Sequence, residues 1–359
     1  MDKLTSLRML AAFFVAGILS FILTPVAKRI AHQVGAIDVP KDDRRMHKEP
    51  IPRLGGIAVF FAFLVAVVVL VPIGTELRGV LLGSVIIVIL GIIDDSISLP
   101  AMAKFVIQII AALVVVLHGT RIDVLSNVNI FSENAYISLG IWSIPVTVIW
   151  IVGITNAVNL IDGLDGLSVG VCTIASLSLL VISAMVSEFM VVVITAALAG
   201  ACIGFLPYNM NPAKIFVGDT GATFLGFILA TMSIQGMFKT YAILSFAAPF
   251  LVLGLPIFDT AFAICRRLLK GQSPMHADRG HVHHRLIDMG FTQKQTVLIL
   301  YVMSGILGIA AVLLTTSGAI RALLFVVAVL IAAVVGIRIY VTVRKHEKHS
   351  REECEDDQK

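Results

Sequence analysis

The segment Asn156–Ser168, with the sequence NAVNLIDGLDGLS, determines how the rest of the chain can be interpreted. Apolar runs long enough to cross a membrane flank it on both sides. Asn156, Asn159 and Asp162 are spaced three residues apart, so on a helix they share one face. The two Asp-Gly pairs predict that this helix ends here, because glycine adopts turn conformations that other residues avoid. We therefore expect a polar junction between two membrane helices.

The two carboxylates of this junction have no cation within the segment. Asp162 and Asp165 stand among amides, glycines and apolar residues. A divalent cation with a phosphate ligand would supply the missing positive charge. The alternative is an ordinary helix end with solvated turn residues, and the four further polar clusters below favour a binding site instead.

The composition is that of an all-α polytopic membrane protein. Of the 359 residues, 58% are hydrophobic and 14% are charged, whereas soluble domains carry about 25% charged residues. We expect about eleven transmembrane helices, each near the ~20 residues that span a bilayer, and a bend at Pro249 and Pro256 in the ninth. The apolar segments are 8–27, 54–73, 79–93, 101–118, 140–157, 168–186, 189–206, 221–237, 241–264, 296–315 and 321–341.

The positions of the positive charges predict the orientation. Of the 27 Lys and Arg residues, 21 fall on one set of connections and six on the other. The basic side is expected to be cytoplasmic, which places the N-terminus outside and the C-terminus inside. On the outer side, the partial alternation of 119–139 predicts a small hairpin. Residues 1–343 are expected to form a single transmembrane domain, and 344–359 a charged, disordered cytoplasmic tail.

Other partner classes receive no support from the sequence. The net charge of +4 is modest, and we predict no nucleic-acid partner. The four cysteines show neither zinc-site spacing nor a disulfide framework.

The first of the further clusters lies in the loop before the second apolar segment. Lys48 and Arg53 precede the pair Gly55-Gly56. Cations beside a glycine pair suit an anionic ligand that approaches the backbone closely. The alternative is that these cations only reflect the general excess of Lys and Arg in cytoplasmic loops. That alternative explains the Pro-x-Arg-x-Gly-Gly turn less well.

The second cluster is the pair Asp94-Asp95 at the cytoplasmic end of the third apolar segment. Adjacent carboxylates at a membrane boundary repel each other and resist desolvation. A bound metal ion would relieve this repulsion, and so would Lys104, which opens the next helix. Because the C-terminal end of a helix favours cations, two acids here favour a functional role.

The remaining two clusters lie nearer the C-terminus. Asp219, between glycines before a helix, is either a helix cap or a ligand, and Phe216 is either core or a platform for a flat base. The loop around residues 266–285 is basic and histidine-rich, as phosphate oxygens would require, but lacks a zinc motif. Its candidate ligands are Arg279, His281, His283 and His284. Just before it, Asp259 lies inside an apolar segment, and Arg266 is its expected partner.

All five clusters fall on the predicted cytoplasmic side. Acids suited to Mg²⁺ and cations suited to phosphates would then meet at the membrane surface. This convergence predicts phosphoryl transfer between a water-soluble donor and a lipid acceptor.

The motifs resemble those of the polyprenyl-phosphate N-acetylhexosamine-1-phosphate transferases, which form glycosyltransferase family 4. The resemblance covers about residues 5 to 340 and rests on motifs in the family's order. They are Asp94-Asp95, Asn156-x-x-Asn159-x-x-Asp162-Gly163-x-Asp165-Gly166, Gly218-Asp219-x-Gly221 and Ala277-Asp278-Arg279-Gly280-His281-x-His283-His284-Arg285. It implies transfer of a sugar 1-phosphate from a UDP-sugar to undecaprenyl phosphate, with Mg²⁺ and release of UMP.

Two loops indicate the branch of the family. The branch that uses UDP-MurNAc-pentapeptide typically reads Pro-Thr-Met-Gly-Gly and His-His-His-Phe-Glu. Here the loops read Pro52-Arg53-Leu54-Gly55-Gly56 and His281-Val282-His283-His284-Arg285. This is similar to the UDP-GlcNAc branch, which includes the enzymes that start wall teichoic acid linkage units. A third acid that some members of that branch carry is replaced by Ser98, so it offers no metal ligand here.

The resemblance also implies roles for single residues. Asp94, Asp95 and Asp219 would be the catalytic acids and the ligands of Mg²⁺, with Mn²⁺ as an alternative ion. The predicted partners are UDP-GlcNAc, undecaprenyl phosphate and the lipid bilayer of the plasma membrane, and a homodimer stays open. The implied substrate-binding residues are Lys48, Arg53, Lys104, Asn156, Asn159, Asp162, Asp165, Phe216, Arg279, His281, His283 and His284.

Two alternatives remain at this point. One is the pentapeptide transferase of peptidoglycan synthesis. The other is a transporter or lipid flippase, which should carry internal repeats and polar sites near the bilayer midplane. The sequence shows no repeat, and its acids lie at the predicted cytoplasmic edge.

Overall fold

A computed structural model of the chain describes residues 2–40, 49–126, 136–186, 188–238, 247–273 and 280–317, with the single positions 323, 325 and 327. The described residues are mostly helical, and the short strands form two antiparallel pairs. The α-helices are α1 (Lys3–Val34), α2 (Gly55–Leu70), α3 (Thr75–Ile97), α4 (Ala101–Leu117), α5 (Ser143–Leu160), α6 (Leu167–Met185), α7 (Phe189–Asn209), α8 (Gly218–Ser233), α9 (Ala247–Val252), α10 (Gly254–Leu269), α11 (Val282–Asp288) and α12 (Gln293–Ser317). The remaining elements are β1 (Ile37–Asp38), β2 (Ile51–Pro52), β3 (Val124–Ser126), β4 (Tyr136–Ser138), the 3₁₀ turn η1 (Gly140–Trp142) and the π turn η2 (Ile234–Phe238).

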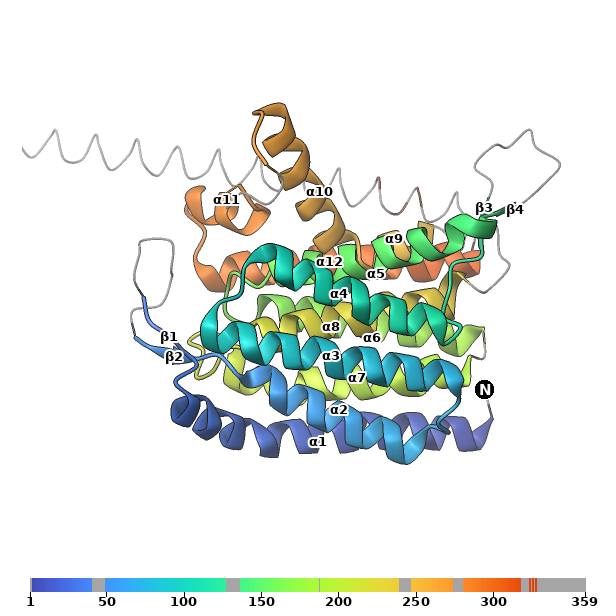
Figure 1. Cartoon of the computed structure of the whole chain (residues 1–359), viewed down its shortest axis with the longest axis horizontal. Coiled ribbons are helices and arrows are strands. Elements are labelled where there is room, and N and C mark those ends of the chain that lie inside the picture. Colours follow the sequence, from blue (N-terminus) through green and yellow to red (C-terminus); the bar gives the residue numbers. More distant parts are fainter. Residues whose placement is uncertain are drawn as a thin grey trace, which may run out of the picture.

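The long helices lie side by side in one bundle (Figure 1). Within the described residues, six of them are long and apolar enough to cross a membrane: α1, α3, α5 with η1, α6, α7 and α12. Helices α2 and α4 are shorter apolar helices. The expected all-helical membrane protein is thus confirmed. The number of eleven spans and their orientation stay predictions. The eleventh segment (321–341), apart from positions 323, 325 and 327, and the tail (344–359) lie outside the described residues.

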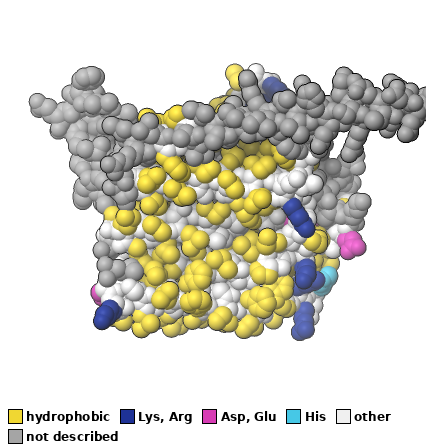
Figure 2. Space-filling model, turned by 180° about the vertical axis from the view of Figure 1, so that it is seen from behind, with side chains coloured by type: hydrophobic (Ala, Val, Ile, Leu, Met, Phe, Trp, Pro, Cys, Tyr) yellow, Lys and Arg dark blue, Asp and Glu magenta, His cyan; other side chains and the backbone are white. Residues whose placement is uncertain are grey.

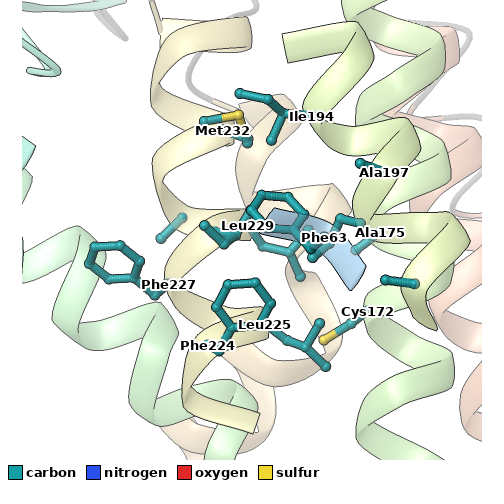
Figure 3. Close-up of a cluster of buried hydrophobic side chains, with 14 of the residues drawn as sticks. Phe63, Cys172, Ala175, Ile194, Ala197, Phe224, Leu225, Phe227, Leu229 and Met232 are labelled. Carbon is teal, nitrogen blue, oxygen red and sulfur yellow. The ribbon is translucent and has the colours of Figure 1, made fainter. Parts of the chain in front are cut away.

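The centre of the bundle is built from α7 and α8, whose side chains are mostly buried. Figure 3 shows Phe63 of α2 among side chains of α6, α7 and α8, such as Ala175, Ile194 and Leu229. Phe227 points to the other side of α8, where it lies against Gly83 of α3. The rings of Phe63 and Phe224 meet edge to face, with centroids 5.3 Å apart. The outer surface carries many hydrophobic side chains, while charged side chains lie towards the two ends (Figure 2). This distribution suits a bundle surrounded by lipid.

The ninth predicted segment, 241–264, is not one straight helix in the part that the structure describes. Helix α9 ends at Val252, and α10 begins at Gly254 and projects away from the bundle (Figure 1). Pro256 lies in the first turn of α10, where a proline removes no intrahelical hydrogen bond. The bend expected at Pro249 and Pro256 is therefore a break, and the prediction of a single helix was wrong. Residues 241–246 lie outside the description.

The helices alternate in direction, and this brings distant polar segments to the same end of the bundle. The end with β1, β2 and α11 also holds the C-terminal ends of α3 and α5 and the N-terminal ends of α4 and α8 (Figure 1). At the opposite end, β3 pairs with β4, from Val124 opposite Ser138 to Ser126 opposite Tyr136. The hairpin predicted within 119–139 is confirmed in these strands.

Candidate active site

Two acids and one lysine from three different helices meet at this end of the bundle. The ammonium of Lys104, on α4, lies 2.6 Å from Oδ2 of Asp94 on α3. The same ammonium lies 3.4 Å from Oδ2 of Asp219 on α8. Asp94 also accepts the backbone N–H of Leu99 at 2.7 Å, which ties its carboxylate to the α3–α4 turn. The predicted neighbourhood of Lys104 and Asp94 is confirmed, and Asp219 joins it.

Asp95 has very different surroundings from Asp94. Its Oδ1 accepts the backbone N–H of Asp219 at 3.0 Å, and its Oδ2 accepts the N–H and the hydroxyl of Thr220 at 3.0 and 2.7 Å. The Asp95 side chain is 0% exposed, with the Nε of Arg53 at 3.6 Å from Oδ1. An acid from α3 thus satisfies the free N–H groups at the start of α8. By contrast, Asp219 and Lys104 are 24% and 28% exposed.

Glycines allow α2, α3 and α8 to approach this closely. Gly55 and Gly56 donate their backbone N–H groups to the carbonyls of Phe216 and Val217, at 2.9 and 2.8 Å. A Cβ on Gly56 would overlap the backbone of Gly221. The pair Gly55-Gly56 was expected to admit an anionic ligand. That expectation was wrong, because the backbone before and within α8 occupies the space.

The polar junction forms as predicted. Helix α5 ends at Leu160, α6 begins at Leu167, and Gly166 adopts a left-handed φ of 79°. Oδ1 of Asp162 accepts the Ser168 hydroxyl at 2.5 Å. The burial of this carboxyl raises the pKa of Asp162 to about 7, although the Ser168 hydrogen bond acts in the opposite direction.

The other polar residues of the junction connect it to its neighbours. Oδ2 of Asp165 accepts the side-chain amide of Asn211 at 2.9 Å and the backbone N–H of Ala213 at 3.0 Å. Asn156 donates to Oε1 of Gln108 on α4 at 2.6 Å. Asn159 is half-buried on the same helix. The junction is therefore tied to α4 and to the loop that leads into α8.

The histidine loop has a different acid partner from the one expected. Oδ2 of Asp259, on α10, lies 2.7 Å from Nδ1 of His281, and Oδ1 accepts the backbone N–H of Val282 at 2.8 Å. The predicted pairing of Asp259 with Arg266 was wrong. The guanidinium of Arg266 instead lies against Gly280, where a Cβ would overlap it.

His283 connects this loop to the junction. It is 3% exposed, and a Cβ on Gly163 would overlap its Nε2. Burial lowers the pKa of His283 to about 3, and the neighbouring His284 acts in the same direction. Its ring stacks on that of His281, with centroids 5.7 Å apart at 11°, and lies 4.2 Å from that of His284. These surroundings suit a neutral ring for His283 rather than a phosphate-binding cation.

The remaining predicted residues are placed as follows. Phe216 is half-buried. Its backbone N–H donates to the carbonyl of Pro52, and its carbonyl accepts the N–H of Gly55. Arg53 lies between Asp95 and Asp38, whose Oδ1 is 3.8 Å from its guanidinium. Lys48 and Arg279 lie outside the described residues.

Sequence reasoning missed several partners of the site. These residues are Gln108, Ser168, Asn211 and Thr220. Gln108 offered a signal, since it is a polar residue inside an apolar segment. The serine, the asparagine and the threonine offered none beyond their place beside motif residues.

The donor set is compatible with Mg²⁺ bound jointly with a substrate. No group of three His, Cys, Asp or Glu side chains is arranged as a metal site within the described part of the chain. Mg²⁺, however, is usually held by one or two carboxylates together with substrate phosphates and water. Asp94 and Asp219 supply two carboxylates that already share one cation, the Lys104 ammonium.

Comparison with known proteins agrees with this geometry. Residues 77–237 match the model of glycosyl transferase family 4. The chain is 40% identical over 327 residues, 90% of each chain, to the probable undecaprenyl-phosphate N-acetylglucosaminyl 1-phosphate transferase of Bacillus subtilis (strain 168). It is 33% identical to the decaprenyl-phosphate N-acetylglucosaminephosphotransferase of Mycolicibacterium smegmatis, over 82% of this chain and 79% of that one. Identity to the phospho-N-acetylmuramoyl-pentapeptide-transferase of Clostridium beijerinckii is lower, at 28% over 85% of this chain and 96% of that one.

These matches extend far beyond the short motifs and cover most of the membrane bundle. The family model, over residues 77–237, includes Asp94, Lys104 and Asp219. The chain therefore belongs to glycosyl transferase family 4, the family that its motifs resemble.

Proposed function

We propose that the chain transfers GlcNAc 1-phosphate from UDP-GlcNAc to undecaprenyl phosphate, giving undecaprenyl diphosphate-GlcNAc and UMP. The observation that carries this proposal is the Lys104 ammonium lying between the carboxylates of Asp94 and Asp219. Acids and cations gathered at the end of a membrane bundle suit phosphoryl transfer from a soluble donor to a lipid acceptor. The printed names of the relatives from B. subtilis and M. smegmatis support GlcNAc as the sugar.

Asp94 and Asp219 are our choice for the residues that hold Mg²⁺, with Mn²⁺ as a substitute. When bound, the ion supplies positive charge to the pyrophosphate oxygens of the donor. Asp95 has a different role in this proposal, since both of its oxygens already accept hydrogen bonds from the start of α8. It keeps Asp219 in place opposite Asp94.

The acceptor phosphate attacks the phosphorus that carries the sugar. A phosphate monoester has its second pKa near 6, so at pH 7 it is mostly a dianion and needs no strong base. Asp94 therefore serves the metal and the orientation of the phosphates. If this is right, Asp94→Asn should lose transfer activity to the same extent at pH 7 and pH 9. Full recovery of activity at pH 9 would instead assign Asp94 as the base.

The chain's other polar groups receive the two ends of the donor. Lys104, His281, His284 and Arg279 are assigned to the phosphate oxygens. Asn159 and Asp162 are assigned to the uridine, with Phe216 stacking on the uracil. Lys48 and Arg53 are assigned to the rim of the same site. His283 and Asp165 support these residues. His283 lies against Gly163 and the rings of His281 and His284, and Asp165 accepts hydrogen bonds from Asn211 and Ala213.

The active site is proposed to face the cytoplasm, where UDP-sugars are found. The excess of Lys and Arg on the connections at this end supports that orientation. The product would be the first lipid intermediate of a cell-envelope polymer, and wall teichoic acid linkage units are our choice. The full arrangement of eleven spans and a homodimer belong to the same proposal.

The proposal is tested by following radiolabelled GlcNAc from UDP-GlcNAc into lipid. Purified protein in detergent receives undecaprenyl phosphate and Mg²⁺, and the organic phase is assayed for label. We expect label in undecaprenyl diphosphate-GlcNAc, together with exchange of labelled UMP into UDP-GlcNAc. Uptake into vesicles without UMP exchange would favour a transporter instead.

A further inference from the structure

We propose that Asp259 is a positioning residue that orients the ring of His281 and fixes its tautomer for contact with the donor phosphates. This inference rests on the function proposed above. The carboxylate uses both oxygens for the histidine loop: Oδ2 lies 2.7 Å from Nδ1 of His281, and Oδ1 accepts the N–H of Val282 at 2.8 Å. The ring and the backbone directly after it are thus held by one side chain.

The pair is enclosed by protein. The side chains of His281 and Asp259 are 7% and 4% exposed. A carboxylate so enclosed is stable only when its oxygens have donors, and here the donors come from a segment 22 and 23 residues further along the chain. The contact therefore joins the projecting helix α10 to the loop that precedes α11.

The chemistry of the contact determines which ring nitrogen is left for a ligand. An ionised carboxylate only accepts hydrogen bonds, so Nδ1 of His281 must carry a proton and Nε2 is the nitrogen left for a substrate. In the neutral ring, Nε2 is an acceptor and would repel a phosphate oxygen. Only a ring that also carries a proton on Nε2 can donate a hydrogen bond to that oxygen.

The neighbouring rings make His281 the best placed of the two buried histidines for this role. His283 stacks on His281 at a centroid distance of 5.7 Å but lies against Gly163. Its Nε2 has no hydrogen-bond partner among the described residues. His281 instead has an acid at Nδ1, an arrangement that in other enzymes fixes the tautomer and the orientation of a working imidazole.

Asp259→Asn tests the proposal because the amide has nearly the same size as the carboxylate. Its NH₂ group cannot accept from Nδ1–H, and it carries no charge. We expect UMP release to fall about 10–100-fold, with little change in the melting temperature, and Asp259→Glu to recover part of the activity. Asp288→Asn, an exposed acid at the end of α11, is the matched control and should keep full activity.

A double-mutant cycle shows whether Asp259 acts through His281. If it does, adding Asp259→Asn to His281→Gln should lower UMP release no further than His281→Gln alone. NMR spectra of protein with isotopically labelled histidine report the ring nitrogens directly, and the signals of His281 are identified by their absence from His281→Gln. They should show a proton on Nδ1, and they should shift in Asp259→Asn.

The outcomes separate this inference from the proposed function. Independent, multiplying losses of activity in the cycle would overturn the inference, as would an unchanged His281 signal in Asp259→Asn. Neither result would affect the transfer reaction itself. Absence of UMP release from the unaltered protein would overturn the proposed function instead, and the nitrogen signals would still decide whether Asp259 fixes the tautomer of His281.

Discussion

The carboxylate of Asp95 accepts both the backbone N–H and the side-chain hydroxyl of Thr220, at 3.0 and 2.7 Å. These contacts join the C-terminal end of α3 to the start of α8. Two adjacent acids therefore have different tasks. Asp94 faces the Lys104 ammonium, which also contacts Asp219, and Asp95 holds the backbone that positions Asp219.

Replacing these two acids should have different effects on stability. Asp95→Ala leaves three donors at the start of α8 without an acceptor, and we expect it to lower the free energy of unfolding by about 1–3 kcal/mol. Asp94→Ala should abolish UMP release with a smaller decrease in melting temperature. Thermal unfolding in detergent, measured beside UMP release, compares the two variants. Equal loss of stability in both would contradict the division of roles.

The contact between Gly163 and His283 should be sensitive to a single methyl group. A Cβ at Gly163 would overlap the imidazole of His283, so Gly163→Ala should displace α11 and weaken binding of the donor. We expect the KM for UDP-GlcNAc to rise about tenfold, the result of a loss of about 1.4 kcal/mol in binding.

The control for this prediction is another glycine on the adjoining helix. Apart from the backbone of its own helix, no atom of the described residues lies within 4 Å of the position that a Cβ on Gly153 would take, so Gly153→Ala should leave the KM unchanged. A normal KM in Gly163→Ala would show that the position of His283 does not affect the donor site.

The raised pKa of Asp162 predicts a pH-dependent contribution to stability. Burial raises the pKa of Asp162 in the folded protein to about 7, from an ordinary value of 3.8. Between these values the folded state binds the proton more tightly than the unfolded state, so this group's contribution to stability falls as the pH rises. Asp162→Asn removes the titrating carboxyl and, with it, this loss of stability at higher pH. Its melting temperature relative to the unaltered protein should therefore be higher at pH 8 than at pH 5, and an identical difference at both values would contradict the prediction.

Metal removal should stop the reaction. We expect EDTA to abolish UMP release and added Mg²⁺ to restore it, because the donor pyrophosphate needs positive charge beyond that of Lys104. Asp219→Asn should raise the half-saturating Mg²⁺ concentration by at least about tenfold. Asp123→Asn, whose carboxylate accepts the Ser143 hydroxyl near the opposite end of the bundle, should leave that concentration unchanged. Equal Mg²⁺ dependence of Asp219→Asn and the unaltered protein would rule out Asp219 as a ligand.

Features that depend on local sequence could be predicted. The junction at Asn156–Ser168 and the hairpin within 119–139 follow from glycine, turn residues and side-chain periodicity, and the structure contains both. Because successive membrane helices alternate in direction, the sequence also predicted that the polar clusters lie at the same end of the bundle. The bounds of α1, Lys3–Val34, extend beyond the apolar run 8–27 at both ends.

Features that depend on long-range packing could not be predicted. Asp94 and Asp95 are neighbours in sequence, and only the approach of α8, over 120 residues later, distinguishes them. The partner of Asp259 was sought on its own helix at Arg266, whereas packing brings His281 to it. The glycine pair at Gly55 was interpreted as space for a ligand because sequence does not show which backbone fills that space.

The central claim is tested most directly by offering UDP-GlcNAc and UDP-MurNAc-pentapeptide separately to the purified protein with undecaprenyl phosphate and Mg²⁺. UMP release is measured for each donor, with Asp219→Ala as the control. We predict UMP from UDP-GlcNAc alone, and none from the Asp219→Ala variant. UMP from the pentapeptide donor alone would contradict the assignment of the sugar, and no UMP from either donor would contradict the transferase reaction itself.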